Sequence, residues 1–277
     1  MILSQTSSSF VAAINQIHYD KFSLLTNNHR NLIRLTKELR DTTQFYITSE
    51  TPCPYLPGRM ERKVFTHLVG LRAKTLNNAL TLAGFRRSQT IGYRPACEGC
   101  TACISVRVRS NEFKPSRTQQ RIIRRNTDLT AISQHKRAST EQFSLFQRYV
   151  RGRHVESGMA DMSFNDYQMM IEDSYVETQI IEYRHRSPHD PAGALVACCL
   201  TDHLSDGLSM VYSFYDPMMR ERSLGVFMIL DHILRTKSAN KPYLYLGYWV
   251  DGSPKMAYKS RYLPQERLER DGWRSVY

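Results

Sequence analysis

The 277-residue sequence predicts an α/β protein in two parts. Residues 1–126 would form a basic, cysteine-containing α+β domain, and residues 127–277 would form a domain with a mixed sheet. Three observations predict this: a basic stretch that ends near residue 126, the cysteine segment CEGCTAC inside it, and a later run of helices and strands. An order of two helices, antiparallel strands, a helix and a strand suits helices packed on a mixed sheet.

The positive charge is concentrated in one third of the chain. The formal net charge is +12, and residues 59–125 hold 15 Lys or Arg against three acids, so the rest is neutral. Such an excess indicates an acidic partner, either nucleic acid or an anionic membrane surface. No apolar run approaches the ~18 residues of a membrane span, and MILSQTSSSFVAAINQ lacks a basic start. We therefore expect a cytoplasmic protein.

The first part opens with a predicted helix over residues 59–83, where apolar residues recur at near-helical spacing and Gly84 is a stop. ISVRV at 104–108 alternates as a strand does. Ser116 then reads as the N-cap of a helix whose basic face carries Arg117, Arg121, Arg124 and Arg125. No acids alternate with these arginines, so we favour a polyanion-binding face over a merely solvated one.

The second part opens with two amphipathic helices, and Ser163 and Asp166 form a capping box at the second. A hairpin turn is predicted at Ser205-Asp206-Gly207, and Ser223 is the predicted N-cap of a later helix. The expected helices cover 140–151, 163–172 and 223–235, and the expected strands 179–184, 193–203, 208–216 and 243–250.

The cysteines allow several interpretations. Cys97, Cys100 and Cys103 stand at CxxCxxC spacing, and Cys53 is the candidate fourth ligand of a tetrahedral zinc site. Overlapping spacing also occurs around iron–sulfur clusters, and purely structural thiols are an equal alternative. Cys198-Cys199 lies in the apolar run ALVACCL, where small core residues are expected.

No GxSxG elbow, Walker loop or Cys-His-Asn arrangement offers a covalent nucleophile. Asp202 and Asp216 end two strands that the turn would bring together, where they could bind an amine and accept its proton, or simply cap turns. Leu224 and Gly225 begin a helix whose N–H groups could hold an anion or a carbonyl oxygen. This loop resembles the phosphate loop of CoA-dependent acetyltransferases, but Phe227 replaces its last small residue.

Several blocks together carry a family resemblance: CPYLPGR, YRPACEGCTAC, FKPSRTQQRIIRRN, VYSFYDP, SLGVF and YLYLGYWVDGSPKMAYKSRYLP. The chain resembles the arginyl-tRNA–protein transferase family over nearly its whole length. Its length and CxxCxxC form are similar to the bacterial branch, the aspartate/glutamate leucyltransferases, whereas eukaryotic members carry a second cysteine where Leu56 stands. The resemblance implies a C-terminal acetyltransferase-like (GNAT-like) domain. It also implies leucine transfer from leucyl-tRNA to proteins that begin with Asp or Glu, which marks them for degradation in the N-end rule pathway.

Site roles follow as hypotheses from this resemblance. An aminoacyl ester is already activated, so the chemistry requires positioning and oxyanion stabilisation but no cofactor. Asp202 or Asp216 would hold or deprotonate the amine, and the N–H groups of Leu224 and Gly225 would bind the oxyanion. The expected substrate-binding residues are Arg59, Tyr212, Tyr215, Ser223, Tyr248 and Lys255, with Arg59 or Lys255 reading the acidic side chain. The expected tRNA-binding residues are Arg86, Arg87, Arg117, Arg121, Arg124 and Arg125.

Three alternatives stay open at this point. The donor could be arginyl-tRNA, because both branches share these blocks. A CoA-dependent acetyltransferase would share the second domain, and a non-catalytic RNA-binding protein would account for the first domain alone.

Overall fold

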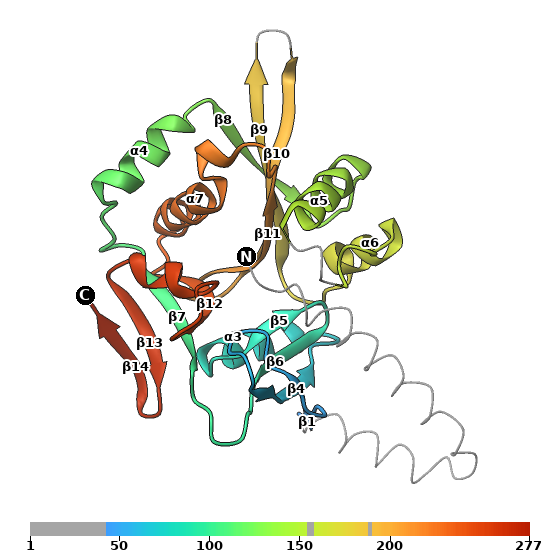
Figure 1. The fold of residues 1–277 in the computed structure, drawn as a ribbon, viewed down its shortest axis with the longest axis vertical. Coiled ribbons are helices and arrows are strands. Elements are labelled where there is room, and N and C mark those ends of the chain that lie inside the picture. Colours follow the sequence, from blue (N-terminus) through green and yellow to red (C-terminus); the bar gives the residue numbers. More distant parts are fainter. Residues whose placement is uncertain (1–42, 154–157, 188–189) are drawn as a thin grey trace.

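The computed structural model describes residues 43–153, 158–187 and 190–277 (Figure 1). Residues 1–42 of the predicted first domain lie outside the described residues. Within the described part, no helix is both long and apolar enough to cross a membrane.

A small unit is built from residues 46–95. Its four-stranded sheet has the order β1-β4-β6-β5, and a separate ribbon joins β2 and β3. Its elements are β1 (Tyr46–Ile47), β2 (Thr51–Pro52), β3 (Met60–Glu61), β4 (Lys63–His67), α3 (Ala73–Leu82), β5 (Arg86–Ser88) and β6 (Ile91–Pro95).

The predicted helix over 59–83 is therefore wrong in its first half. Lys63–His67 forms β4, which pairs with both β1 and β6, and α3 begins only at Ala73. Gly70 has φ +69° between them, a left-handed conformation that ends the strand and turns the chain. The apolar residues of the window were identified correctly as core, since Phe65 and Leu68 are buried, but they lie on a strand and a loop.

A larger unit is an eight-stranded mixed sheet with the order β14-β13-β7-β12-β11-β10-β9-β8. Its strands are β7 (Cys103–Arg109), β8 (Leu129–His135), β9 (Thr178–Ser187), β10 (Asp190–His203), β11 (Gly207–Tyr215), β12 (Tyr243–Val250), β13 (Gln265–Glu269) and β14 (Gly272–Val276). The helices are α4 (Arg117–Arg125), α5 (Thr140–Arg153), α6 (Phe164–Glu172) and α7 (Leu224–Ser238), with the 3-10 turns η1 (Arg220–Arg222) and η2 (Ala257–Arg261). β7 lies between β12 and β13, so the strand after the cysteine segment already belongs to this sheet, before the predicted domain boundary at 126.

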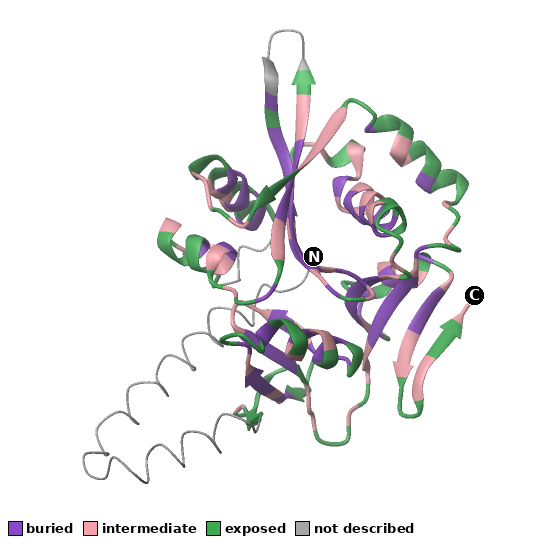
Figure 2. Ribbon diagram, turned by 180° about the vertical axis from the view of Figure 1, so that it is seen from behind, coloured by how far each residue is buried: buried purple, intermediate pink, exposed green. Residues whose placement is uncertain are grey.

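Helices cover both faces of the large sheet. In Figure 1, α4 and α7 lie on one side of the central strands, and α5 and α6 lie on the other. Alternate residues of β10 serve the two layers: Ala197 and Cys199 pack toward α7, whereas Cys198 and Leu200 pack toward α5 and α6. Both adjacent cysteines are fully buried, as the apolar run predicts. Figure 2 shows the buried residues concentrated along these central strands.

The predicted helix starts are largely confirmed. Ser116 caps α4 and Ser163 caps α6, each in a complete capping box. Ser223 precedes α7 as predicted, but it adopts φ 52°, ψ 45° and its side chain makes no cap hydrogen bond. The Ser205–Gly207 turn joins β10 to β11, and Leu204 N–H donates to the Gly207 carbonyl at 2.9 Å.

The middle of the large sheet is split. β11 and β12 run parallel but pair only over Gly207–Ser209 and Tyr243–Tyr245. Beyond that point one extra residue, Leu246, interrupts the register between β12 and β7, and such a bulge bends a strand away from its neighbour. The gap between β11 and β12 faces the first turn of α7 and the small unit, and it positions the candidate site.

Candidate active site

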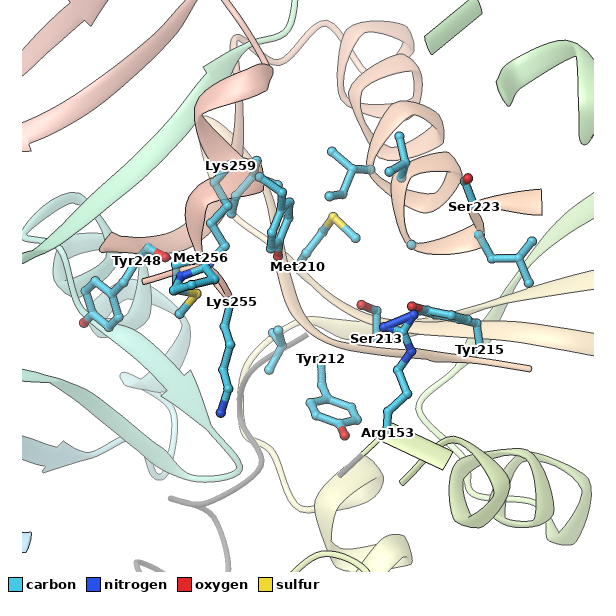
Figure 3. A pocket seen from close by; sticks show the side chains of 18 of the residues that line it. Arg153, Met210, Tyr212, Ser213, Tyr215, Ser223, Tyr248, Lys255, Met256 and Lys259 are labelled. Atoms are coloured by element: carbon cyan, nitrogen blue, oxygen red, sulfur yellow. Dashed lines mark hydrogen bonds between the residues drawn. The ribbon is translucent and has the colours of Figure 1, made fainter. Parts of the chain in front are cut away.

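A cavity of about 420 Å³ lies at this split, between the large sheet, the start of α7 and the small unit. Figure 3 shows side chains from these elements pointing into it, with Lys259, Met256 and Tyr248 at one end and Ser223, Tyr215 and Arg153 at the other. The lining is Tyr55, Arg86, Tyr93, Arg153, Met210, Val211, Tyr212, Ser213, Tyr215, Met219, Arg220, Ser223, Leu224, Gly225, Val226, Ile229, Leu246, Tyr248, Pro254, Lys255, Met256, Tyr258 and Lys259.

The charge of this lining is one-sided. It contains five basic side chains, and no Asp or Glu is among the described residues that form the wall. They are Arg86, Arg153, Arg220, Lys255 and Lys259. Apolar and aromatic side chains make up most of the rest. The cavity therefore suits a ligand that combines an apolar part with negative or developing negative charge.

The first turn of α7 faces the cavity through Leu224 and Gly225. Within the described chain, neither of their N–H groups donates a hydrogen bond to a backbone carbonyl. The Ser223 carbonyl accepts from the next two residues, Val226 and Phe227. The Tyr215 ring lies against Gly225, where an added Cβ would stand 3.3 Å from the ring. Two N–H groups at a helix start can stabilise an oxyanion, as the sequence predicts for these residues.

Phe227 does not obstruct this helix start. Its ring packs on Tyr183 with centroids 5.8 Å apart and lies against the core, outside the cavity lining. Its bulk therefore does not enter the cavity, because its position in the helix turns it toward the sheet.

Arg86 lies inside the cavity rather than on an outer tRNA-binding surface. Its Nη2 donates to the carbonyls of Met210 (3.1 Å) and Val211 (3.2 Å), on β11 beyond the end of its pairing with β12. The guanidinium also lies over Gly247, where any Cβ would stand 1.4 Å from Nη1. The small unit thus projects a half-buried cation into the split of the large sheet.

Lys259, on η2, is a cavity residue that the sequence analysis did not single out. Its side chain is buried, and Nζ donates to the Tyr248 carbonyl at 2.6 Å. Burial, with Arg86 nearby, lowers the pKa of this amine well below its usual 10.5. Lys259 is therefore a buried amine at the cavity wall that gives up its proton more readily than an exposed lysine does.

Asp202 does not lie in the cavity, which contradicts its predicted catalytic role. Its carboxylate is 2 % exposed and is bound by Arg87, with Nε to Oδ2 and Nη2 to Oδ1 both at 2.6 Å, and by Thr178 Oγ1 at 2.7 Å. The prediction that Arg87 binds tRNA is wrong for the same reason, since this arginine is buried. The pair fastens the small unit to the large sheet.

Asp216 is also outside the cavity lining and far from Asp202. Asp202 pairs with Ser209 near the turn, whereas Asp216 follows the opposite end of β11. Seven residues of strand separate them, roughly 20 Å at ~3.3 Å per residue. The prediction that the turn would bring these acids together is wrong, because the carboxyl ends of antiparallel strands point in opposite directions. Asp216 instead accepts a hydrogen bond from Met218 N–H at 2.9 Å and faces Arg148 at 3.5 Å.

Five predicted substrate-binding residues do line the cavity: Tyr212, Tyr215, Ser223, Tyr248 and Lys255. The Tyr248 hydroxyl donates away from it, to the Gly84 carbonyl at 2.9 Å, so its ring and backbone form the wall. Arg59 is not brought to the cavity. It lines a separate pocket of about 280 Å³ and donates to Cys100 Sγ at 3.4 Å.

The arginines of α4 are exposed, as a binding face requires: Arg117, Arg121, Arg124 and Arg125. The helix ends beside η1, where the exposed Arg220 lines the cavity and so marks an entrance to it. Asn126 Nδ2 donates to the Arg222 carbonyl at 2.9 Å, and Arg125 donates to the Glu221 carbonyl, both on η1. Arg220, at the start of η1, lines the cavity. A basic surface therefore runs from α4 to the entrance.

The cysteines gather beneath the small pocket. Burial, and then the neighbouring thiols of Cys53, Cys97 and Cys100, raises the pKa of Cys103 from 9.0 to about 12. Among the described residues, no group of three or more His, Cys, Asp or Glu side chains is arranged to hold a metal ion. The zinc, iron–sulfur and structural-thiol interpretations of these cysteines stay predictions.

Sequence reasoning missed Arg153, Arg220 and Lys259, and it misassigned Arg86. Lys259 stands in SPKMAYKSRYLP, where its spacing from Lys255 could have placed both on one face of a turn. Burial of one lysine and exposure of the other depends on η2 packing beneath β12. The local sequence carries no signal for that packing.

Fold and site together define an α/β protein with a cationic cavity at the start of a helix, whose described wall contains no carboxylate. Comparison with known sequences is consistent across the chain. Residues 51–121 match the profile "Arginine-tRNA-protein transferase, N terminus" and residues 141–269 match its C-terminal counterpart. The chain belongs to the arginine-tRNA-protein transferase family.

Individual relatives are more specific. The chain is 59 % identical over 246 residues to the "Aspartate/glutamate leucyltransferase" of Bradyrhizobium sp. (strain ORS 278), covering 87 % of this chain and 95 % of that protein. It is 58 % identical over 247 residues to the protein of that name from Methylobacterium sp. (strain 4-46), covering 87 % and 100 %. Among solved structures, FemX is similar with a TM-score of 0.43 at 8 % identity, over 82 % of this chain and 69 % of that chain.

Proposed function

We propose that this protein transfers leucine from leucyl-tRNA to the α-amino group of proteins that begin with Asp or Glu. The observation that carries the proposal is the cavity, which is cationic, has no carboxylate in its described wall and is lined by Leu224 and Gly225 at the start of α7. The names of the two relatives, which are aspartate/glutamate leucyltransferases, support both the donor residue and the acceptor class.

The reaction joins two groups without a covalent enzyme intermediate. The neutral α-amine attacks the leucyl ester carbonyl, a C–N bond forms, and the C–O bond to the terminal ribose of tRNA breaks. One proton leaves the amine and one reaches the ribose oxygen. In this proposal, the N–H groups of Leu224 and Gly225 stabilise the oxyanion that develops between these events.

The cations of the cavity favour the reactive form of the amine. A free α-amine has a pKa of about 7.7–8.0, and neighbouring positive charge lowers it further. Lys259 replaces Asp202 as the candidate proton acceptor, because burial favours its neutral form and it lines the cavity. Proton transfer by a positioned side chain typically contributes about 10²- to 10⁴-fold in rate.

The surface outside the cavity supports a tRNA donor. Phosphates along an acceptor arm could lie on the exposed arginines of α4, and Arg220 continues this basic surface to the entrance. Such contacts hold a polyanion without reading its sequence. Apolar wall residues such as Met210, Ile229 and Leu246 then suit an uncharged leucyl side chain better than an arginyl one, because the described cavity wall already has four arginine and lysine side chains besides Lys259.

The decisive experiment offers the protein labelled leucyl-tRNA and, separately, labelled arginyl-tRNA with peptides that begin with Asp, Glu, Lys or Ala. We expect labelled leucine on the Asp and Glu peptides only. Labelled arginine on those peptides would agree with the family but would show that the donor is arginyl-tRNA rather than leucyl-tRNA. Binding of acetyl-CoA by calorimetry, with no transfer from either tRNA, would replace the proposal by an acetyltransferase.

A further inference from the structure

Arg86 differs from the other inward-facing arginines of the fold. Arg87 is neutralised by Asp202, with N–O distances of 2.6 Å, and Arg107 pairs with Glu266 at 2.6 Å. Arg86, although half-buried, makes no ion pair with any carboxylate in the described part of the chain, and the cavity wall around it contains none. A partly buried cation without a counter-charge is more stable when an anionic ligand binds to it than when the site holds no ligand.

The main chain fixes this guanidinium in one orientation. The bulge at Leu246 leaves β11 without its partner just where the carbonyls of Met210 and Val211 accept from Nη2. Gly247 has φ +77°, and a Cβ there would stand 1.4 Å from Nη1 and 2.3 Å from Cζ. The bulge thus opens the sheet for Arg86, and the glycine leaves it room.

Both carbonyls are bound from the same nitrogen of the guanidinium, Nη2. The Tyr93 hydroxyl is a further partner of the group, so every partner of this guanidinium among the described residues is a neutral oxygen. A guanidinium that neutral oxygens hold in place keeps its full charge for a ligand, and its planar fork orients a carboxylate more closely than a flexible lysine ammonium does. Lys255, by comparison, is exposed at the cavity rim.

The position of Arg86 within the cavity separates it from the donor end. Its charge acts on Tyr93, Tyr248 and Lys259, and Figure 3 shows Tyr248 and Lys259 at the end opposite Ser223 and Tyr215. The helix start and the basic entrance lie at the Ser223 end. A tRNA ester held there leaves the Arg86 end for the acceptor.

We propose that Arg86, seated in the bulged split between β11 and β12, binds the side-chain carboxylate of the acceptor's N-terminal Asp or Glu. This assignment rests on the proposed transfer activity and names the residue that selects its acceptor. It replaces Arg59, which faces the cysteines, and makes Lys255 secondary. Gly247 is a positioning residue that acts only through Arg86.

The test compares matched peptides that differ only in the first residue, Asp against Asn and Glu against Gln, at fixed leucyl-tRNA. Loss of a charge-assisted hydrogen-bonded pair corresponds to about 10- to 100-fold, so Arg86→Gln should lower kcat/KM for the Asp and Glu peptides by that factor. The Asn and Gln peptides should change little. Arg86→Lys should retain part of the preference, and Gly247→Ala should lose it as Arg86→Gln does.

Arg94→Gln is the matched control. Arg94 lies on the neighbouring strand β6, is exposed and donates to the Ala83 carbonyl, outside the cavity. The Arg94→Gln variant should leave acceptor preference unchanged. Thermal melts of each variant show whether a loss is one of folding, and the conservative Arg86→Lys keeps the test decisive if Arg86→Gln does not fold.

Three outcomes would overturn the assignment. Equal losses on acidic and amide peptides would mean that Arg86 holds a tRNA phosphate. Unchanged acid preference in Arg86→Gln would exclude it as the reader, and preference lost only in Lys255→Gln would give the role to Lys255. Calorimetric binding of Asp and Asn peptides to the full-length protein separates this inference from the proposed function. Acid-selective binding that needs Arg86 would support it even if the parent protein transferred no leucine.

Discussion

Asp202→Asn should weaken the fold far more than the chemistry. The Asp202–Arg87 pair is 2 % exposed on both sides and makes two 2.6 Å contacts, so neutralising the acid leaves a buried guanidinium without a counter-charge. Removing one partner of a buried pair costs about 3–5 kcal/mol, out of a typical total stability of about 5–15 kcal/mol. For a chain of 277 residues, an unfolding entropy of about 2.1 cal/mol/K per residue converts this loss to a melting temperature lower by roughly 5–9 °C.

The assay is urea unfolding followed by circular dichroism, with leucine transfer measured per folded molecule well below the melting temperature. Asp216→Asn is the control, because its contact with Arg148 is long and largely solvated and such pairs contribute about 0–1 kcal/mol. The double variant Arg87→Met/Asp202→Leu should recover most of the stability, since an apolar pair leaves no unmatched charge. An Asp202→Asn protein with the parent's urea midpoint and no transfer would refute this reasoning and restore a catalytic Asp202.

Three further predictions address other parts of the molecule. Lys259→Met should lower kcat by about 10²- to 10⁴-fold, because it removes the candidate proton acceptor. The urea midpoint should change little, because the variant also removes a buried amine that costs free energy to desolvate. A kcat equal to that of the parent would exclude Lys259 as the base. Burial lowers the pKa of His232 from 6.5 to about 4, so only the unfolded chain takes up this proton as pH falls from about 6.5 to 4. Unfolding free energy should therefore fall by about 3 kcal/mol over that interval, and urea titrations of His232→Gln should show a shallower decline than those of the parent. The double variant Arg121→Gln/Arg124→Gln should weaken leucyl-tRNA binding and leave acceptor preference unchanged. The slope of log K against log salt concentration should fall by roughly one unit for each phosphate that the variant no longer contacts. An unaltered slope would exclude α4 from the phosphate-binding surface.

The sequence predicted local structure correctly where interactions within a short segment determine that structure. Capping boxes at Ser116 and Ser163 depend on residues three positions apart, and both form. The buried Cys198-Cys199 pair follows from an apolar run. In contrast, 59–83 contains apolar residues at a spacing that a helix and a strand with a loop can both satisfy, and Gly70 together with pairing from β1 and β6 decided between them.

The order of residues was sufficient to predict the basic surface, the helix start at Leu224 and Gly225, and the family to which the chain belongs. Which charges lie inside depends on folding. Arg86 and Arg87 are adjacent on β5, and their side chains point to opposite faces of the strand. One therefore lies in the cavity while the other pairs with Asp202, some 115 positions away in the chain. No local pattern distinguishes the two arginines, because the cavity and the acid come from strands that meet them only on folding.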